Sequence, residues 1–452
     1  MRTDEYLTAL TEQIRCKKAR DGVTKEIRSH IEDQQAYYES EGLEASEAEL
    51  LAVKEMGSPV ETGIELDRIH RPKMAWGIIA LIGIISIAGY VAQYMLQMNF
   101  EQADFLPYNG LRYIFHLIIG FSLMTAICFF DYSQIRYWAK EITVVLFLVL
   151  ILQVSLFGIT YNGLRTWVRV GRITLDVRQI LFLSVPLYGA ILYSYRGEGY
   201  GVLVKAAAWM LPAVVIALRC PSITTAVMLV TAFVVTLSVA VWMDWFHISR
   251  IKTLTAIWSG MFLLPVIGSL VILRFGAAYQ AARIKAMVDA SDEGGGYLLR
   301  TIRGLLAGSQ MIGSNEMPIE RMLPSSSDYV LTYIISHYGI LAAVLLVGLM
   351  AGLFLCLLKV SLKQKNQLGM LMGVGCTTAL LVQLLLYILG NTGVLLVSNY
   401  CPFLNYGGSG MLMTYILLGL LLSICRYENV ISDVTLSAKR KRGFRIRLII
   451  EK

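Results

Sequence analysis

The stretch Leu323-Pro324-Ser325-Ser326-Ser327-Asp328-Tyr329 is followed by an apolar run that continues to Leu358. This run is long enough to cross a membrane, because a bilayer core of about 30 Å needs ~20 apolar residues in a helix. The carboxylate of Asp328 then stands where a polar loop enters a membrane helix. An ionisable group there is costly unless it faces protein or water, which favours a functional role. The alternative is that Asp328 N-caps the helix by accepting hydrogen bonds from its first free N–H groups.

Composition extends this reading to the whole chain. The 452 residues are 56% hydrophobic and 16% charged, and apolar runs of similar length recur. We therefore expect an all-α, polytopic membrane protein of about ten transmembrane helices. The seven cysteines form no CxxC and no Cys/His cluster, so neither a disulfide framework nor a metal site is predicted. The spans are expected at about 74–98, 111–130, 142–160, 177–195, 201–218, 221–245, 255–274, 329–358, 367–391 and 407–425.

Basic residues orient these spans. Arg71 and Lys73 precede the first span, and basic residues in that place usually stay in the cytoplasm, so both termini are expected inside. The net charge of +8 collects in loops and in the basic tail, 429–452, which favours anionic membrane lipid over nucleic acid as its partner. A large outer loop is expected at 275–328. One outer loop departs from the rule, because Arg165 and Arg169 lie between the third and fourth spans. Such cations call for an anionic partner.

Residues 1–72 are predicted to form a separate cytoplasmic unit of three or four short helices. Tyr6, Leu10 and Ile14 recur at helical spacing, and later segments repeat the pattern. The unit resembles the helical prefix domain found ahead of various Firmicute membrane proteins, which suggests partner binding or regulation. A plain folding role remains the alternative. The matching positions are Ile31-Glu32-Asp33, Gly42, Glu47-Ala48 and Met56-Gly57-Ser58-Pro59.

The outer loop 161–171 reads YNGLRTWVRVG. It is similar to the NGaRRWi.lG motif of the SEDS family, the shape, elongation, division and sporulation proteins of the RodA/FtsW/SpoVE type. Further family landmarks follow in order and extend the resemblance over about 74–425. They are Pro221 to Ala226 for PDLGTA, Arg283, Gly296-Tyr297, Gly308 to Gly313, Leu323 to Tyr329 for LPE.hTDFIF, and Cys401 to Ser409 for LPFiSYGGS.

The chain also departs from the family pattern, and each departure removes charge or polarity. Where the family has QPSE..K, this chain has Asp176 to Gln179 and then Phe182, so the glutamate and the lysine are lost. The PDLGTA aspartate is replaced by Ser222. The acidic pair that usually follows the loop aspartate is Ser336-His337, whereas Asp328 itself is retained. These differences mark a divergent member.

The resemblance implies a peptidoglycan glycosyltransferase that polymerises lipid II beside a class B penicillin-binding protein in the bacterial cytoplasmic membrane. Asp328 is then the catalytic candidate, as the general base that takes the proton of the acceptor hydroxyl. The leaving pyrophosphate needs cations, for which Arg165, Arg169 and Arg283 are the candidates. A divalent cation is compatible with this chemistry, and no other cofactor is predicted. Asn162 and Trp167 complete the expected substrate contacts.

Other readings remain open. Arg165 and Arg169 could form salt bridges or reach lipid head groups, and Trp167 could be an interfacial belt residue. The chain could also be a non-catalytic scaffold for a partner synthase, as the lost polar residues suggest. A transporter of lipid-linked precursors would need polar groups at mid-membrane depth, yet no acidic residue falls inside the predicted third to tenth spans except Asp244, next to the end of the sixth. A groove joining Asp328 to the three arginines would favour the enzyme.

Overall fold

The computed structural model describes residues 1–99, 110–161, 164–170, 173–275, 296–314, 328–428 and 430. Within these residues, ten helices are long and apolar enough to cross a membrane. The predicted polytopic, all-α class is therefore confirmed. The helices with an unbroken span are α5 (Trp76–Asn99), α6 (Gly110–Phe129), α10 (Gly201–Arg219), α11 (Ile223–Trp242), α12 (Arg250–Phe275), α16 (Ile340–Leu362), α17 (Gln367–Asn391) and α18 (Gly408–Arg426).

Two spans are built from several pieces. The third, Tyr132–Phe157, joins the 3₁₀ turn η1 (Tyr132–Gln134), α7 (Ile135–Leu152) and the π-helical turn η2 (Gln153–Phe157). The fourth, Val177–Ser194, joins α8 (Val177–Ile180), the 3₁₀ turn η3 (Leu181–Leu183) and α9 (Ser184–Ser194). Between α12 and α16, the described residues form two shorter helices outside the spans, α14 (Tyr297–Ala307) and α15 (Val330–Tyr338).

The chain divides into two compact units. Among the described residues, the first comprises 1–75 with the short segments 363–370 and 424–430, and the second comprises 76–362 and 371–423, which include the membrane helices apart from the ends of α17 and α18. The N-terminal part folds into α1 (Thr3–Gln13), α2 (Lys17–Ser40), α3 (Ala45–Glu55) and α4 (Pro59–His70). The periodic side chains Tyr6, Leu10 and Ile14 are fully buried in its core. The Tyr6 hydroxyl also donates to the Met56 carbonyl oxygen at 3.0 Å.

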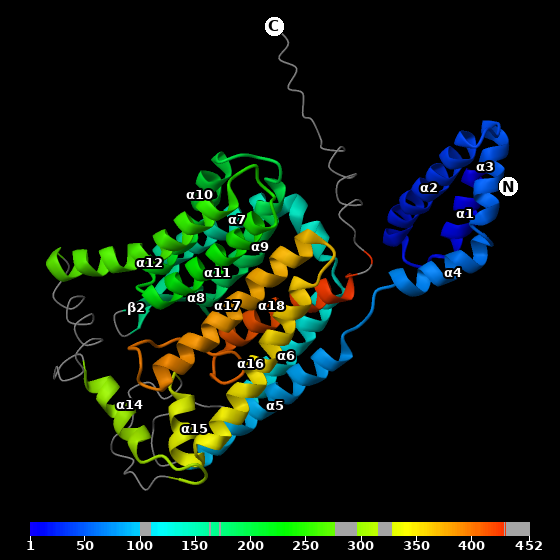
Figure 1. Cartoon of the computed structure of the whole chain (residues 1–452). Coiled ribbons are helices and arrows are strands. Elements are labelled where there is room, and N and C mark those ends of the chain that lie inside the picture. The colour runs from blue at the N-terminus through cyan, green and yellow to red at the C-terminus, as the bar shows by residue number, and fades with distance from the viewer. Residues whose placement is uncertain are drawn as a thin grey trace. The chain divides into compact units, whose positions relative to one another are not determined.

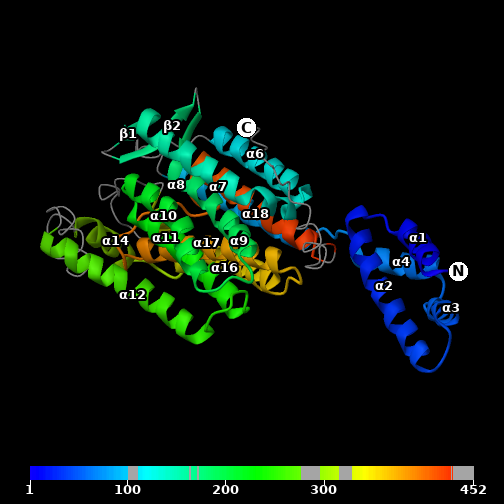
Figure 2. The same cartoon turned by 90° about the horizontal axis from the view of Figure 1, so that it is seen from above.

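Burial separates the central helices of the second unit from its edge. In the most apolar window of α17, 72% of the residues are buried, whereas none are buried in the corresponding window of α12. Figures 1 and 2 show α12 at the border of the bundle, with one side uncovered by other helices. Because a membrane protein turns apolar side chains toward lipid, this side of α12 is suited to hydrocarbon.

A small antiparallel sheet replaces the outer loop expected at 161–171. Its strands are β1 (Gly158–Tyr161), β2 (Leu164–Val170) and β3 (Ile173–Asp176), in the order β1-β2-β3 (Figure 2). Along β2, Thr166 and Val168 are each 1% exposed, while Arg169 points to solvent. The third span was therefore placed too late, at 142–160, because it ends at Phe157 where the strand pattern begins.

Moving the third span toward the N-terminus brings charged residues into it. Arg136 and Lys140, which were expected in an inside loop, lie on α7, and so does Glu141. The expectation that spans three to ten hold no acidic residue other than Asp244 is therefore wrong. All three charges lie in the first half of the span, where long side chains can reach polar surroundings at the end of a helix.

The predicted span 329–358 is wrong in one respect, because it is two helices rather than one. Gly339 lies between α15 and α16 with φ of 95° and ψ of 166°, a backbone conformation that residues other than glycine rarely adopt. The segment that follows α14 packs at this break. Its Gln310 and Met311 carbonyl oxygens accept from the N–H groups of Ile340 and Leu341 at 3.0 and 3.1 Å. The membrane span thus begins at Ile340.

Candidate functional site

Asp328 immediately precedes the N-terminus of α15. The N-cap position belongs to Tyr329, so the reading of Asp328 as the N-cap residue is wrong. The Asp328 carboxylate instead faces the chain that follows α17, where the Ser398 hydroxyl donates to its Oδ2 at 2.5 Å. The side chain is partly exposed. The carboxylate is therefore held at a surface that solvent or substrate reaches.

Asn391, the last residue of α17, fixes the backbone around Asp328. Its Nδ2 donates to the Asp328 carbonyl oxygen at 3.2 Å, and its Oδ1 accepts from the Thr332 N–H at 3.1 Å. The Thr332 hydroxyl completes the link by donating to the Asn391 carbonyl oxygen at 2.8 Å. Because Thr332 and Asn391 are almost fully buried, these bonds face little competition from water. Asn391 therefore links α17 to α15 by hydrogen bonds.

A polar cavity of about 260 Å³ opens beside Asp328. Its walls come from β2, β3, α8, the start of α11 and the segment from Ser398 to Gly410, so residues far apart in sequence meet here. Ser222 and Thr225 contribute the wall from α11, where their hydroxyl oxygens lie 2.8 Å apart. The charged and aromatic side chains that line it are Asp176, Arg178, Asp328, Trp167, Tyr400 and Tyr406.

Arg178 and Asp176 form an ion pair in the wall of this cavity. Arg178 Nε donates to Asp176 Oδ1 at 3.0 Å and Nη2 donates to Oδ2 at 2.7 Å, which is the forked arrangement that fixes a guanidinium most firmly. The guanidinium carbon also lies 5.4 Å from the ring centroid of Trp167. Trp167 and Asp176 are direct neighbours across β2 and β3. The sheet therefore assembles this charged cluster.

The segment before α18 closes the other side of the cavity. The Ser409 hydroxyl oxygen accepts from the Asp176 N–H at 3.0 Å, which joins this segment to β3. Gly408 packs so closely that an added Cβ would lie 2.7 Å from His116 Nε2. Only glycine permits such a close approach at this position. Two amide oxygens in this wall, Asn399 Oδ1 and Asn405 Oδ1, are buried without a hydrogen-bond partner in the described part of the chain.

The predicted site residues are distributed as follows. Trp167 lines the cavity together with Asp328. Arg169 is exposed on β2 and is not part of the cavity wall, while Arg165 pairs with Thr160 across the sheet, and its side chain lies outside the described part. Asn162 and Arg283 also lie outside the described residues. The roles assigned to all five stay predictions.

Sequence reasoning did not select Arg178 or Asp176 as site residues. They appeared only as departures from a motif, yet they bring an acidic and a basic side chain into the segment that has lost the glutamate and the lysine. The signal that could have found them is their position, because two charges directly before an apolar span rarely lack a partner. In the described ranges, no three His, Cys, Asp or Glu side chains gather as a metal site.

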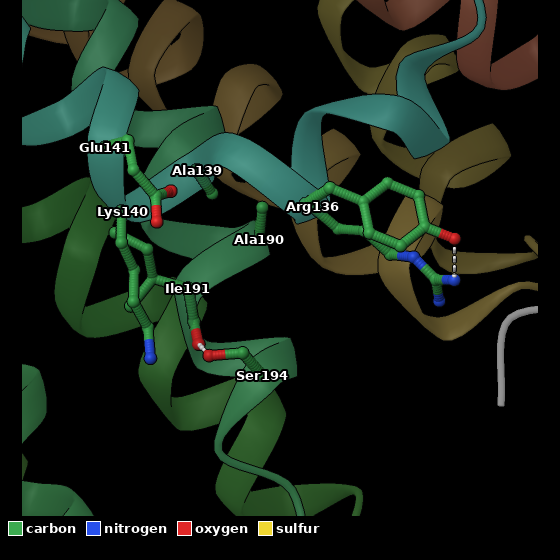
Figure 3. A pocket seen from close by; sticks show the side chains of 8 residues that line it. Arg136, Ala139, Lys140, Glu141, Ala190, Ile191 and Ser194 are labelled. Carbon is green, nitrogen blue, oxygen red and sulfur yellow. Dashed lines mark hydrogen bonds between the residues drawn. The ribbon is translucent and has the colours of Figure 1, made fainter. Parts of the chain in front are cut away.

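A second cavity, of about 310 Å³, lies between α7 and α9 (Figure 3). Its two cations point apart rather than toward a shared centre. Arg136 Nη2 donates to the Tyr137 hydroxyl at 2.5 Å, and Lys140 Nζ lies 4.4 Å from the centroid of the Tyr195 ring. Because each cation already faces its own aromatic ring, this cavity lacks the convergent charge that an anion requires.

Comparison with known proteins adds the family. A family model described as cell cycle protein, FtsW/RodA/SpoVE, matches residues 72–430. The chain belongs to this family. The predicted SEDS resemblance is thereby confirmed, and the match covers the Asp328 cavity but leaves out the N-terminal helices. The resemblance of residues 1–72 to a helical prefix domain stays a prediction.

Relatives match nearly over their full length. A probable peptidoglycan glycosyltransferase FtsW of Coxiella burnetii is 23% identical over 369 residues, which is 78% of this chain and 96% of the relative. Stage V sporulation protein E of Bacillus subtilis is 23% identical over 362 residues, covering 77% and 94%.

Solved structures share the fold. A chain from a peptidoglycan synthase complex that coordinates polymerisation and crosslinking aligns with a TM-score of 0.65 and 22% identity, covering 78% of this chain and 98% of the other. The rod shape determining protein RodA of Thermus thermophilus aligns with a TM-score of 0.56 and 20% identity, covering 78% and 97%.

Proposed function

We propose that this protein is a peptidoglycan glycosyltransferase that polymerises lipid II into glycan strands. Family membership and the names of its relatives support the activity. The observation that carries the proposal is that Asp328 opens into a polar cavity instead of being packed in a dry helix start. Ser398 holds its carboxylate there, and Asn391 holds its backbone carbonyl. The proposal assigns Asp328 as the general base.

The chemistry follows from the position of this carboxylate. Asp328 accepts the proton of the acceptor sugar hydroxyl while the hydroxyl oxygen attacks the anomeric carbon of the donor. The bond from that carbon to the pyrophosphate oxygen breaks, and undecaprenyl pyrophosphate leaves with the electron pair. A single displacement of this kind inverts the anomeric configuration. The proton stays on Asp328 until solvent removes it after product release.

The membrane setting and the partner are part of the same proposal. The multi-pass helices and the basic residues flanking them support a cytoplasmic membrane location with both termini inside. Asp328 and its cavity then face the outer side. The structural likeness to a chain of a peptidoglycan synthase complex supports a class B penicillin-binding protein as the partner.

Polymerisation of labelled lipid II by the purified full chain, alone and with candidate class B partners, tests the proposal. Asp328→Asn keeps the shape of the side chain and removes the base, so we expect no polymer from it. The matched control is Asp244→Asn, because Asp244 is exposed outside the cavity and has a positive φ of 59° that asparagine also tolerates. Polymer from the wild type and the control, but not from Asp328→Asn, is the expected result. Full activity of Asp328→Asn would contradict the assignment.

A non-catalytic scaffold is the second candidate. Gln179 and Phe182 favour it, since they replace the charged residues of the family motif, and Gln179 lies in the cavity wall where it only accepts a 3.4 Å hydrogen bond from Gln383. If no partner elicits polymer from the wild type while the complex with a partner still forms, the scaffold replaces the enzyme.

A further inference from the structure

Arg178 is the one Lys, Arg or His side chain among the described residues that line the Asp328 cavity. Two of its three nitrogens, Nε and Nη2, are held by Asp176, and Nη1 has no hydrogen bond within the described part of the chain. The side chains of Arg178 and Asp176 are only 25% and 13% exposed. Their charges therefore act across the cavity with less screening than surface charges have.

The position of Arg178 is fixed from three sides. Asp176 holds the guanidinium in two parallel hydrogen bonds, Trp167 lies under it at 5.4 Å, and its own N–H donates to Asp176 Oδ1 at 2.9 Å. An arginine fixed in this way does not swing freely to follow a ligand. It presents a constant positive charge to the cavity.

Several elements around the cavity carry charged or titratable groups near Asp328. Asp328 and Asp176 both stabilise the positive charge of Arg178, so the cation stands under the influence of two carboxylates. Cys220, which also faces this pair, is a neutral thiol because burial raises its pKa to about 11. On α17 the Tyr387 hydroxyl accepts from the Leu331 N–H at 3.3 Å and carries no charge near neutral pH. The described charges around Asp328 are thus one cation and one competing anion.

We propose that Arg178 is a positioning residue that keeps Asp328 ionised as the general base, and that Asp176 sets how much of its positive charge reaches Asp328. The role of Asp328 as the base rests on the proposed function. Electrostatic attraction is mutual, so the cation that Asp328 stabilises also stabilises the Asp328 carboxylate. Asp176 opposes this effect because it neutralises part of the same cation.

The proposal predicts shifts of opposite sign. Arg178→Met removes the cation from the cavity and raises the pKa of Asp328, because a positive charge in the same cavity favours the ionised form of a carboxyl group. Asp176→Asn removes the competing anion and lowers the pKa of Asp328, while asparagine can still accept the N–H at the start of α8. If the ion pair had only a structural role, both variants would lose folding stability, and the pKa of Asp328 would not shift in opposite directions.

Infrared difference titration of the full chain measures this pKa without any need for activity. The carboxyl band that is present in the wild type and absent in Asp328→Asn reports protonation of Asp328. We expect its midpoint to move up in Arg178→Met, to move down in Asp176→Asn, and to recover in Arg178→Lys, which restores the charge without the fork. Lys252→Met, which changes an exposed lysine at the start of α12, is the control and leaves the midpoint in place.

The pH profile of lipid II polymerisation is a second measurement of the ionisation of Asp328. The acidic limb of kcat/KM should follow the infrared midpoint, to higher pH in Arg178→Met and to lower pH in Asp176→Asn. An unchanged midpoint in both variants overturns the role of Arg178 even when Asp328→Asn abolishes polymerisation. Conversely, shifted midpoints in a chain that makes no polymer support the electrostatic coupling and remove the proposed function instead.

Discussion

Replacing Gly339 by alanine should destabilise the protein and displace Asp328. Gly339 has φ of 95° and ψ of 166°, where a residue with a side chain pays about 1–3 kcal/mol. An added Cβ would also lie 2.6 Å from the Met311 carbonyl oxygen and 2.9 Å from the Ile312 Cα. These are backbone atoms, so relieving the overlap requires the chain to move, which typically costs a further ~1–3 kcal/mol. The expected loss is therefore about 2–6 kcal/mol.

Unfolding of the purified protein in mixed micelles of rising SDS content measures this loss. Gly348→Ala is the matched control, because Gly348 lies within α16, where nothing is within 4 Å of an added Cβ. There alanine favours the helix by about 0.5–1 kcal/mol, so the same chemical change has the opposite sign. Polymerisation by Gly339→Ala should fall by roughly a hundredfold, since a catalytic group displaced by about 1 Å loses that much. Equal stability of the two variants would refute the reasoning.

Two further predictions concern single hydrogen bonds. Thr332→Val removes the hydroxyl that donates to Asn391 and should lower the free energy of unfolding by about 1–2 kcal/mol in the same assay. Its control is Thr125→Val, which changes an exposed threonine and should alter the free energy of unfolding by no more than about 0.5 kcal/mol. The hydrogen bond from the Thr3 N–H lowers the pKa of Glu49, so its contribution to stability is present above the unfolded value near ~4.3 and is lost as the pH falls. Hydrogen exchange of α1, corrected for intrinsic rates, should therefore accelerate in acid in the wild type but not in Glu49→Gln.

The sequence was informative where chain length and hydropathy decide the structure. Ten spans follow from apolar runs alone, because only a helix satisfies its own backbone in lipid. The same runs could not show the break at Gly339, since apolar residues continue on both sides of it and the contact that requires glycine comes from the distant Met311. The strand β2 was missed because its sequence does not alternate regularly, since Trp167 and Val168 are adjacent apolar residues. The alternation shows only in the structure, where Thr166 and Val168 are buried and Arg169 is exposed.

The candidate site was predictable in part, for a similar reason. Asp328 and Trp167 belong to motifs that can be read along the chain, and both line the cavity. Arg178 could not be preferred over the loop arginines from sequence alone, because what distinguishes it is the pairing of β2 with β3, which places Trp167 beside Asp176. A basic residue in a motif indicates that an anion or a carboxylate lies near it. Which arginine actually contacts that carboxylate depends on the register of the paired strands.

The position of Asp328 depends on three elements that the membrane does not itself align. The Gly339 break lets α15 run in a different direction from α16 (Figure 1). Asn391 at the end of α17 holds the backbone on either side of Tyr329, and Ser398 holds the carboxylate. A single straight helix from 329 onward would have carried Asp328 with the lipid-facing span. By breaking the helix, the chain gains a short element whose orientation is set by protein contacts rather than by lipid. A carboxylate in such a place stays hydrated and near a cation, and these are the conditions under which it can act as a base.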